Sequence, residues 1–108
     1  MAVPVPYEYC ARHYGRVSRP PLWLQECPWD DQGVIGLLVA EGRLVLMCDD
    51  CGTVWCTKHD LDHGRFSQPA SPEWRSGCGV AVAPGTTRWG TRDDLASHAD
   101  WLAMHWHE

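Results

Sequence analysis

The sequence predicts a small α+β domain with a β-hairpin core, an irregular N-terminal arm and one C-terminal α-helix. Three observations predict it: two apolar runs flank a Glu-Gly turn, cysteines stand at both feet of that hairpin, and an amphipathic pattern follows near the C-terminus. With 108 residues the chain is expected to form one domain with a modest core. We divide the single domain 1–108 into the arm (1–26), the hairpin with its cysteines (27–56), a loop-rich segment (57–90) and the helix (91–107).

The arm is rich in proline and aromatic residues and shows little periodicity, so we expect it to pack irregularly over the hairpin. It has neither a basic n-region nor an apolar h-region, and we therefore expect no signal peptide. No apolar run in the sequence approaches membrane-spanning length. These features predict a cytoplasmic protein that makes no use of a membrane. The cysteines of such a protein are expected to be reduced, which favours metal binding over disulfides.

The hairpin is predicted from residues 34–40 as one strand, Glu41-Gly42 as the turn and residues 43–47 as the return strand. A hairpin brings its two feet side by side. The segment Cys27-Pro28-Trp29-Asp30 is therefore expected to lie opposite Cys48-Asp49-Asp50-Cys51-Gly52. Two thiols in a Cys-x-x-Cys-Gly turn can point toward one metal ion.

The loop-rich segment is dominated by turn-forming pairs such as His63-Gly64, and only residues 80–83 could form a short strand there. The helix over 91–107 is predicted from Thr91 as the N-cap, from acidic residues in the first turn and from one apolar face. Asp94 and His98 lie on a second stripe of that helix. We interpret them as a surface pair, because no nucleophile is recognisable near them.

The candidate metal ligands are Cys27, Cys48 and Cys51, and a Zn²⁺ ion held by them would staple the small core. The identity of the fourth ligand is open. Asp30 stands where a second thiol would complete the first half-site, and carboxylate oxygen is a legitimate zinc ligand. The rival ligands lie in the arm, where the Cys10/His13 pair has the same spacing and could even replace the Cys27/Asp30 pair.

A site closed by four protein ligands favours a structural role for the metal over a catalytic one. The competing interpretation is that Cys48 and Cys51 are ordinary buried thiols or a redox pair. The aspartates between them would raise their pKa values, which is the wrong direction for a reactive thiolate.

A second metal site is an alternative for the next group of cysteine and histidine residues. On one helical turn Cys56, His59 and His63 would share a face, and Cys78 or Cys10 could complete the set. We favour the simpler interpretation, a polar turn with two solvated histidines and a buried Cys56.

At three places the chain resembles small bacterial zinc-ribbon proteins: Cys27-Pro28, the apolar strand that runs into Cys48-Asp49-Asp50-Cys51, and Val54-Trp55. The resemblance covers residues 27–56. It implies zinc ligation by Cys27, Cys48 and Cys51, and Asp30 departs from the usual Cys-Pro-x-Cys pattern. Many proteins of this type are uncharacterised, and some similar ones lie among bacterial conflict and immunity genes.

The net charge of -5 argues against a protein that grips nucleic acid on its own, although eight of the nine basic residues are arginine. We expect a zinc-stabilised module that binds another protein, and we favour this binding role over an enzymatic one. A specific version is an immunity-type or accessory protein whose acidic face meets a basic partner. The seven tryptophans could supply core, or anchors for a partner.

Two alternatives belong to other functional classes. A nucleic-acid-binding or transcription-associated ribbon would use the one cluster of basic residues, Arg12, Arg16 and Arg19. A small zinc enzyme would need an exchangeable fourth position on the metal. The sequence shows no cue for a substrate.

Overall fold

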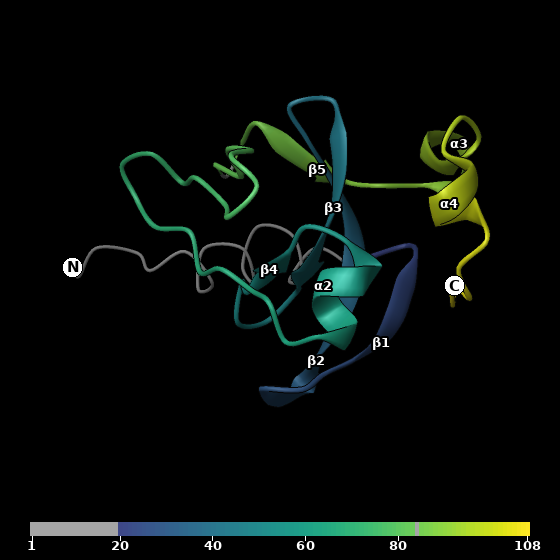
Figure 1. The fold of residues 1–108 in the computed structure, drawn as a ribbon, viewed down its shortest axis with the longest axis horizontal. Coiled ribbons are helices and arrows are strands. Elements are labelled where there is room, and N and C mark those ends of the chain that lie inside the picture. Colours follow the sequence, from purple (N-terminus) through teal and green to yellow (C-terminus); the bar gives the residue numbers. More distant parts are fainter. Residues whose placement is uncertain (1–19, 84) are drawn as a thin grey trace.

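The computed structural model describes residues 20–83 and 85–108, and its centre is an antiparallel sheet with the strand order β1-β2-β3-β4 (Figure 1). A further strand, β5, also pairs with β2. The strands are β1 (Trp23–Cys27), β2 (Asp30–Ala40), β3 (Arg43–Cys48), β4 (Val54–Trp55) and β5 (Thr87–Trp89), and the helices are α2 (Lys58–Asp62), α3 (Arg92–Leu95) and α4 (Ala99–Leu102). The small α+β class with a hairpin core is confirmed. No helix of the described residues has the length and apolar character needed to cross a bilayer.

The hairpin formed by β2 and β3 is the part of the fold that the sequence predicts best. Its register runs from Ala40 opposite Arg43 to Ile35 opposite Cys48. Glu41 and Gly42 form the turn with φ values of 52° and 74°. Two consecutive positive φ values are typical of the type I′ turn, whose twist matches that of the flanking strands. This turn therefore fixes the register that delivers Cys48 to the foot of the hairpin.

The long strand β2 is shared by three neighbours. One edge pairs with β3, while the other pairs with β1 along its first half and with β5 near its end. The predicted irregular arm is therefore wrong for residues 23–26, which belong to strand β1. Leu22 and Leu24 are buried in the core there. Their burial against the sheet outweighs the weak local signal of this proline-flanked segment.

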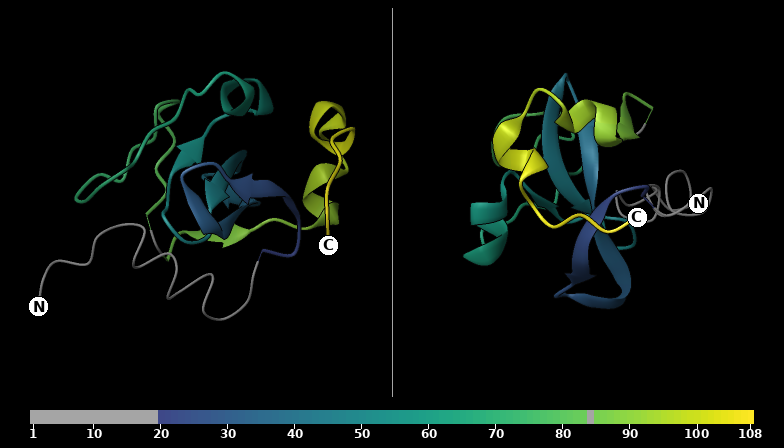
Figure 2. Two further views of the ribbon diagram at one scale, coloured as in Figure 1. Left: turned by 90° about the horizontal axis from the view of Figure 1, so that it is seen from below. Right: turned by 90° about the vertical axis from the view of Figure 1, so that its right-hand side faces the viewer.

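Both faces of the sheet are covered, which explains why residues 34–40 of β2 and 44–48 of β3 are continuously apolar instead of alternating. One face packs against the C-terminal helices and α2 through a cluster that includes Leu37, Trp55 and Leu95. The opposite face packs against residues 80–82 of the loop-rich segment, where Val80 and Val82 are buried. Figures 1 and 2 show α3 and α4 to one side of the sheet and this segment to the other. Residues 80–83 form only an isolated bridge, between Arg75 and Ala81.

The predicted helix over 91–107 is instead two single turns, α3 and α4, separated by residues 96–98. After α4 the chain becomes extended, and the backbones of Trp23 and His107 exchange hydrogen bonds of 3.1 and 2.8 Å. This pairing buries Trp106, whose indole Nε1–H donates to the Trp101 carbonyl at 2.7 Å. A continuous helix would not let residue 107 reach β1, so the tertiary contact overrides the helical pattern.

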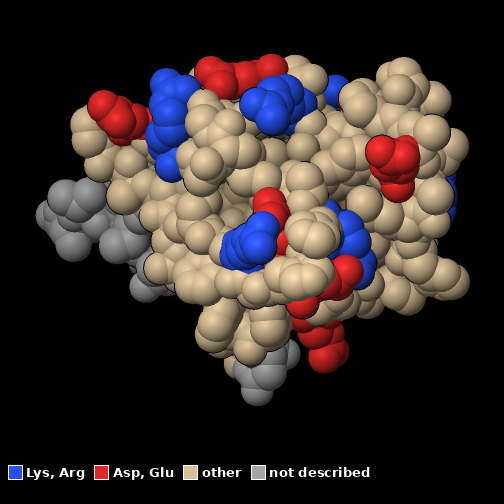
Figure 3. Space-filling view, viewed as in Figure 1, with Lys and Arg blue, Asp and Glu red and all other residues tan. Residues whose placement is uncertain are grey.

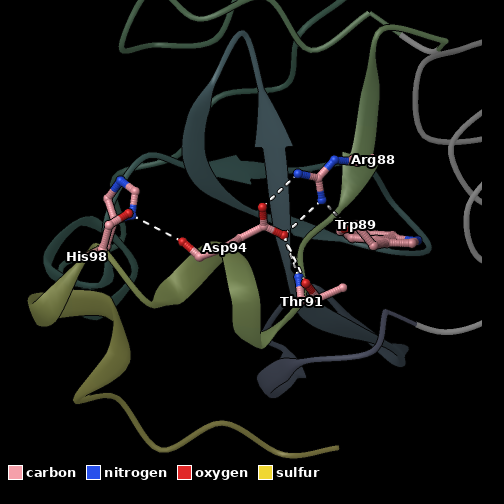
Figure 4. A network of polar contacts seen from close by, with 6 residues as sticks. Arg88, Trp89, Thr91, Asp94 and His98 are labelled. Atoms are coloured by element: carbon pink, nitrogen blue, oxygen red, sulfur yellow. Dashed lines mark hydrogen bonds and ion pairs between the residues drawn. The ribbon is translucent and has the colours of Figure 1, made fainter.

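The start of α3 is fixed by a polar network around Asp94 (Figure 4). Arg88 donates two hydrogen bonds to its carboxylate, at 2.8 and 2.7 Å, and the Thr91 backbone N–H donates a third at 2.8 Å. Hydrogen bonds from Arg88, together with those from Thr91, hold the pKa of Asp94 below its usual range. His98 Nδ1 lies 3.1 Å from the Asp94 carbonyl oxygen and not on the carboxylate. The side chains of Asp94 and His98 therefore do not form the predicted pair, because the Asp94 carboxylate is held by Arg88 and Thr91.

We expect Asp94→Asn to lower the free energy of unfolding by about 1 kcal/mol at pH 7, because it weakens one bidentate ion pair and one helix cap. The folded-state pKa of Asp94 is depressed, so its contribution is present above the unfolded value and is lost as the pH falls through the folded value. Urea denaturation at pH 7 and at low pH measures the difference. Asp93→Asn is the matched control, since Asp93 is an exposed acid of the same helical turn. Equal effects of the two substitutions would contradict this role of Asp94.

Candidate metal centre

Three thiols from different parts of the sheet meet at the foot of the hairpin. The Sγ atoms of Cys27, Cys48 and Cys51 all lie within 4.8 Å of one another. Cys27 is the last residue of β1, Cys48 the last of β3, and Cys51 follows in the turn after β3. Cys27 and Cys48 are buried, while Cys51 is half-buried. In the described part of the chain this is the only such group of three or more Cys, His, Asp or Glu side chains. The three predicted cysteine ligands therefore come together.

Backbone N–H groups point at two of the sulfurs. Those of Asp50 and Cys51 donate to Cys48 Sγ, each at 3.4 Å, and that of Trp29 donates to Cys27 Sγ at 3.4 Å. Such bonds orient a ligand and stabilise negative charge on sulfur. Both turns after the strands are thus folded as knuckles around a sulfur atom. Gly52, with φ of 74°, lets the second knuckle return to the sheet.

The knuckles are held by partners that the sequence analysis did not single out. The Asp49 carboxylate is buried and accepts a hydrogen bond from the Val34 N–H at 2.9 Å, which ties the second knuckle to β2. Gly33 lies so close to the site that a Cβ atom there would be 2.5 Å from Cys48 Sγ. A glycine inside a strand signals such a close approach, but Gly33 lies just before the strand predicted over residues 34–40, so the sequence pattern did not single it out.

The three thiols differ in their pKa values. A hydrogen bond from the Cys48 thiol, opposed by burial, lowers the pKa of Cys51 to about 5. That same bond and burial raise the pKa of Cys48, and burial raises the pKa of Cys27. Thr53 Oγ1, 3.2 Å from Cys51 Sγ, accepts a hydrogen bond from Gln68 and can therefore donate its own hydrogen to the sulfur. Cys51 is the thiol that ionises first.

The donor set fits a thiolate-binding metal ion. Cys27 Sγ and Cys51 Sγ are 3.7 Å apart. In a tetrahedral site with metal–sulfur bonds of about 2.3 Å, neighbouring sulfurs are separated by about 3.8 Å. Soft thiolate donors select zinc and similar ions over magnesium or calcium. The group can therefore hold a metal ion through three sulfurs.

The candidates for a fourth ligand lie beyond what the structure describes. The backbone of Asp30 pairs with Cys27 at the start of β2, but its side chain is outside the described atoms. Cys10 and His13 lie outside the described residues. The choice between Asp30 and the arm pair therefore stays a prediction.

The residues of the alternative second site are arranged differently. Cys56 and Cys78 form a disulfide with 6.1 Å between their Cα atoms, in contrast to the expectation of reduced cysteines throughout. His59 and His63 are exposed on α2 and at its end, with ring centroids 4.1 Å apart. The turns of the intervening loop bring Cys78 back beside β4, and a pairing across 22 residues leaves no local signal.

An exposed aromatic pair adjoins the first knuckle. The Trp29 and Phe66 rings meet edge to face with centroids 5.1 Å apart. Their exposed fractions are 58% and 47%. Trp29 comes from the Cys27 knuckle, and Phe66 comes from the loop after α2. The metal centre and the disulfide-closed loop therefore each contribute one ring to the same surface.

Comparisons of the chain with protein-family models, with curated proteins and with solved structures found no match. The geometry of this site is therefore the basis for a functional assignment.

Proposed function

We propose that this chain is a cytoplasmic, zinc-stabilised module of the zinc-ribbon type that binds another protein. The zinc assignment is supported by three sulfurs within 4.8 Å of one another, of which Cys27 Sγ and Cys51 Sγ have the spacing of a tetrahedral site, and by the N–H groups directed at two of them. Cys27 and Cys48 belong to the main core cluster together with Trp55 and Leu37. A metal held there acts as a structural staple, because it joins the end of β1 to the end of β3.

The single observation that carries the binding role is the position of Trp29. Its backbone N–H is bonded to Cys27 Sγ, and yet more than half of its side chain is exposed. Folding does not require a large aromatic ring to face solvent at the turn residue whose N–H bonds to a ligand sulfur. Exposed aromatic residues on a rigid support are typical anchors of protein interfaces. The metal would hold the Trp29 ring in place, and Phe66 would add to the apolar surface that the partner contacts.

The class of partner is suggested by charge. The net charge of -5 favours a basic protein, which supports an immunity-type or accessory role. On the face shown in Figure 3, acidic and basic side chains are interspersed. A partner that binds this face would therefore be recognised by individual ion pairs more than by a uniformly negative potential. The arginine cluster behind the nucleic-acid alternative lies outside the described residues. That alternative and the metalloenzyme alternative stay predictions.

Replacing both rings of the pair, Trp29→Ser with Phe66→Ser, is expected to weaken partner binding at least tenfold, or about 1.4 kcal/mol, while zinc content is unchanged. The partner would first be captured from cells that express this chain, with the zinc-loaded chain as the bait. The purified partner would then be titrated against the chain by calorimetry. Leu102→Ser is the matched control, because Leu102 is also an exposed apolar residue, 45% accessible, on α4. An affinity that stays the same in the double variant, or falls equally in the control, would contradict the proposal.

A further inference from the structure

A surface pocket of about 290 Å³ lies beside β4, and both halves of the Cys56–Cys78 disulfide line it. Both cysteines are half-buried. The other lining residues are Val54, Asp60, Arg65, Phe66, Ser67 and Gly77. A disulfide that only braced the loop would have no need of a pocket with charged groups. We propose that this pocket is a thiol–disulfide exchange site for small thiols of the amino-acid type, which attack Cys56 and release Cys78.

The hydroxyl of Ser76 distinguishes the two sulfurs. Ser76 is buried, and its Oγ lies 3.3 Å from Cys78 Sγ. The backbone N–H of Val80 donates to the same Oγ at 3.2 Å, so the hydroxyl hydrogen is free to point toward Cys78. A thiolate that leaves from Cys78 would be stabilised by this hydrogen bond. Exchange is faster when the leaving thiol has the lower pKa, so the attacked atom is Cys56 Sγ.

The charged residues of the pocket match the two charges of an amino-acid-type thiol. Arg65 is exposed at the pocket and is suited to a carboxylate, while Asp60 is half-buried there and is suited to an ammonium group. Phe66 supplies an apolar wall for the carbon chain of the thiol. The substrate class is therefore a cysteine-containing amino acid or short peptide, not a neutral alkyl thiol.

The exchange balances in two steps. The incoming thiol gives its proton to solvent, and its thiolate forms a bond to Cys56 Sγ as the Cys56–Cys78 bond breaks. Cys78 leaves as a thiolate, accepts the Ser76 hydrogen bond and takes a proton from water. A second small thiol then attacks the sulfur of the bound one, which gives an oxidised thiol dimer and frees Cys56. The protein disulfide gains two electrons, and the two small thiols lose them.

The test uses the full zinc-loaded chain with its disulfide intact and reduced glutathione as the probe. Samples are quenched with acid at intervals and are analysed by intact and peptide mass spectrometry. Reduced glutathione attacks disulfides and not the free thiols of the metal centre. We expect a mixed disulfide on Cys56. Arg65→Gln should slow the reaction with glutathione about twofold to fivefold, the size of an exposed ion pair, while the rate with neutral 2-mercaptoethanol stays the same.

Arg43→Gln is the matched control, because Arg43 is an exposed arginine of β3 that does not line the pocket. It should leave both rates unchanged. Ser76→Ala should slow exchange with both thiols about fivefold, since the leaving thiolate loses its donor. The adduct position and the Arg65 comparison do not depend on how well that variant folds. An adduct on Cys78, an equal effect of Arg65→Gln on both thiols, or reaction only in denaturant would each overturn the proposal. This inference does not rest on the metal centre.

Discussion

Chelation of the zinc-loaded chain is expected to unfold it. Cys48 is fully buried, Cys27 is 5% exposed, and both pack in the cluster that contains Trp55. Without the metal, two protonated thiols and one thiolate would occupy this apolar site. Structural zinc binds small zinc-finger domains with roughly 10–16 kcal/mol, which is comparable to the entire stability of a typical domain, about 5–15 kcal/mol. Loss of the ion is thus sufficient to shift the whole folding equilibrium.

Native mass spectrometry should show one zinc per chain. As a chelator removes the zinc, far-ultraviolet circular dichroism should show loss of the sheet. Cys48→Ser should abolish stoichiometric zinc binding, because it replaces the most buried of the three sulfurs. Cys56→Ser is the matched cysteine control. It should keep one zinc and should cost about 2–5 kcal/mol through loss of the disulfide. A chelated chain that keeps its fold, or a Cys48→Ser variant that still binds one zinc, would remove the structural role of the metal.

The parts of the fold that the sequence predicts are those governed by local chemistry. The Glu41-Gly42 turn sets the hairpin register, and the hairpin sets the position of Cys48. The Cys-x-x-Cys-Gly spacing then determines the second knuckle. At the start of α3, Thr91 occupies the predicted N-cap position, and its N–H donates to the Asp94 carboxylate, as in one half of a capping box. Each of these inferences needs only a few neighbouring residues.

The features that the sequence does not reveal depend on contacts between distant segments. Strand β1 forms because Trp23–Cys27 adds to the edge of β2. The C-terminal helix is interrupted because His107 pairs with Trp23. The Cys56–Cys78 pairing needs the whole loop between them. Propensity is a weak guide in such cases, because tertiary contacts outweigh local preferences of less than about 1 kcal/mol per residue.

Gly33→Ala is expected to disrupt the metal centre without removing a ligand. The added Cβ atom would lie 2.5 Å from Cys48 Sγ and 3.0 Å from Asp50 Cβ. Both contacts are too short for carbon against sulfur or carbon, so the second knuckle must move away from β2. The hydrogen bond from Val34 to Asp49 holds the knuckle on that strand and resists the movement. Overpacking of this kind costs about 1–3 kcal/mol, and we expect a loss near the upper end.

Because the displaced atom is a metal ligand, zinc affinity should fall about a hundredfold in Gly33→Ala, the size of effect seen when ligand positions are disturbed. Competition with a chromophoric chelator measures the affinity, and urea denaturation measures the stability. Gly77→Ala is the matched control, since its nearest neighbours, Ser67 Cβ and Oγ, would be 3.8 Å away. That distance is an ordinary contact, and the change should stay within about 0.5 kcal/mol. If Gly33→Ala binds zinc as the original chain does, Cys48 does not hold the metal in the place where this geometry puts it.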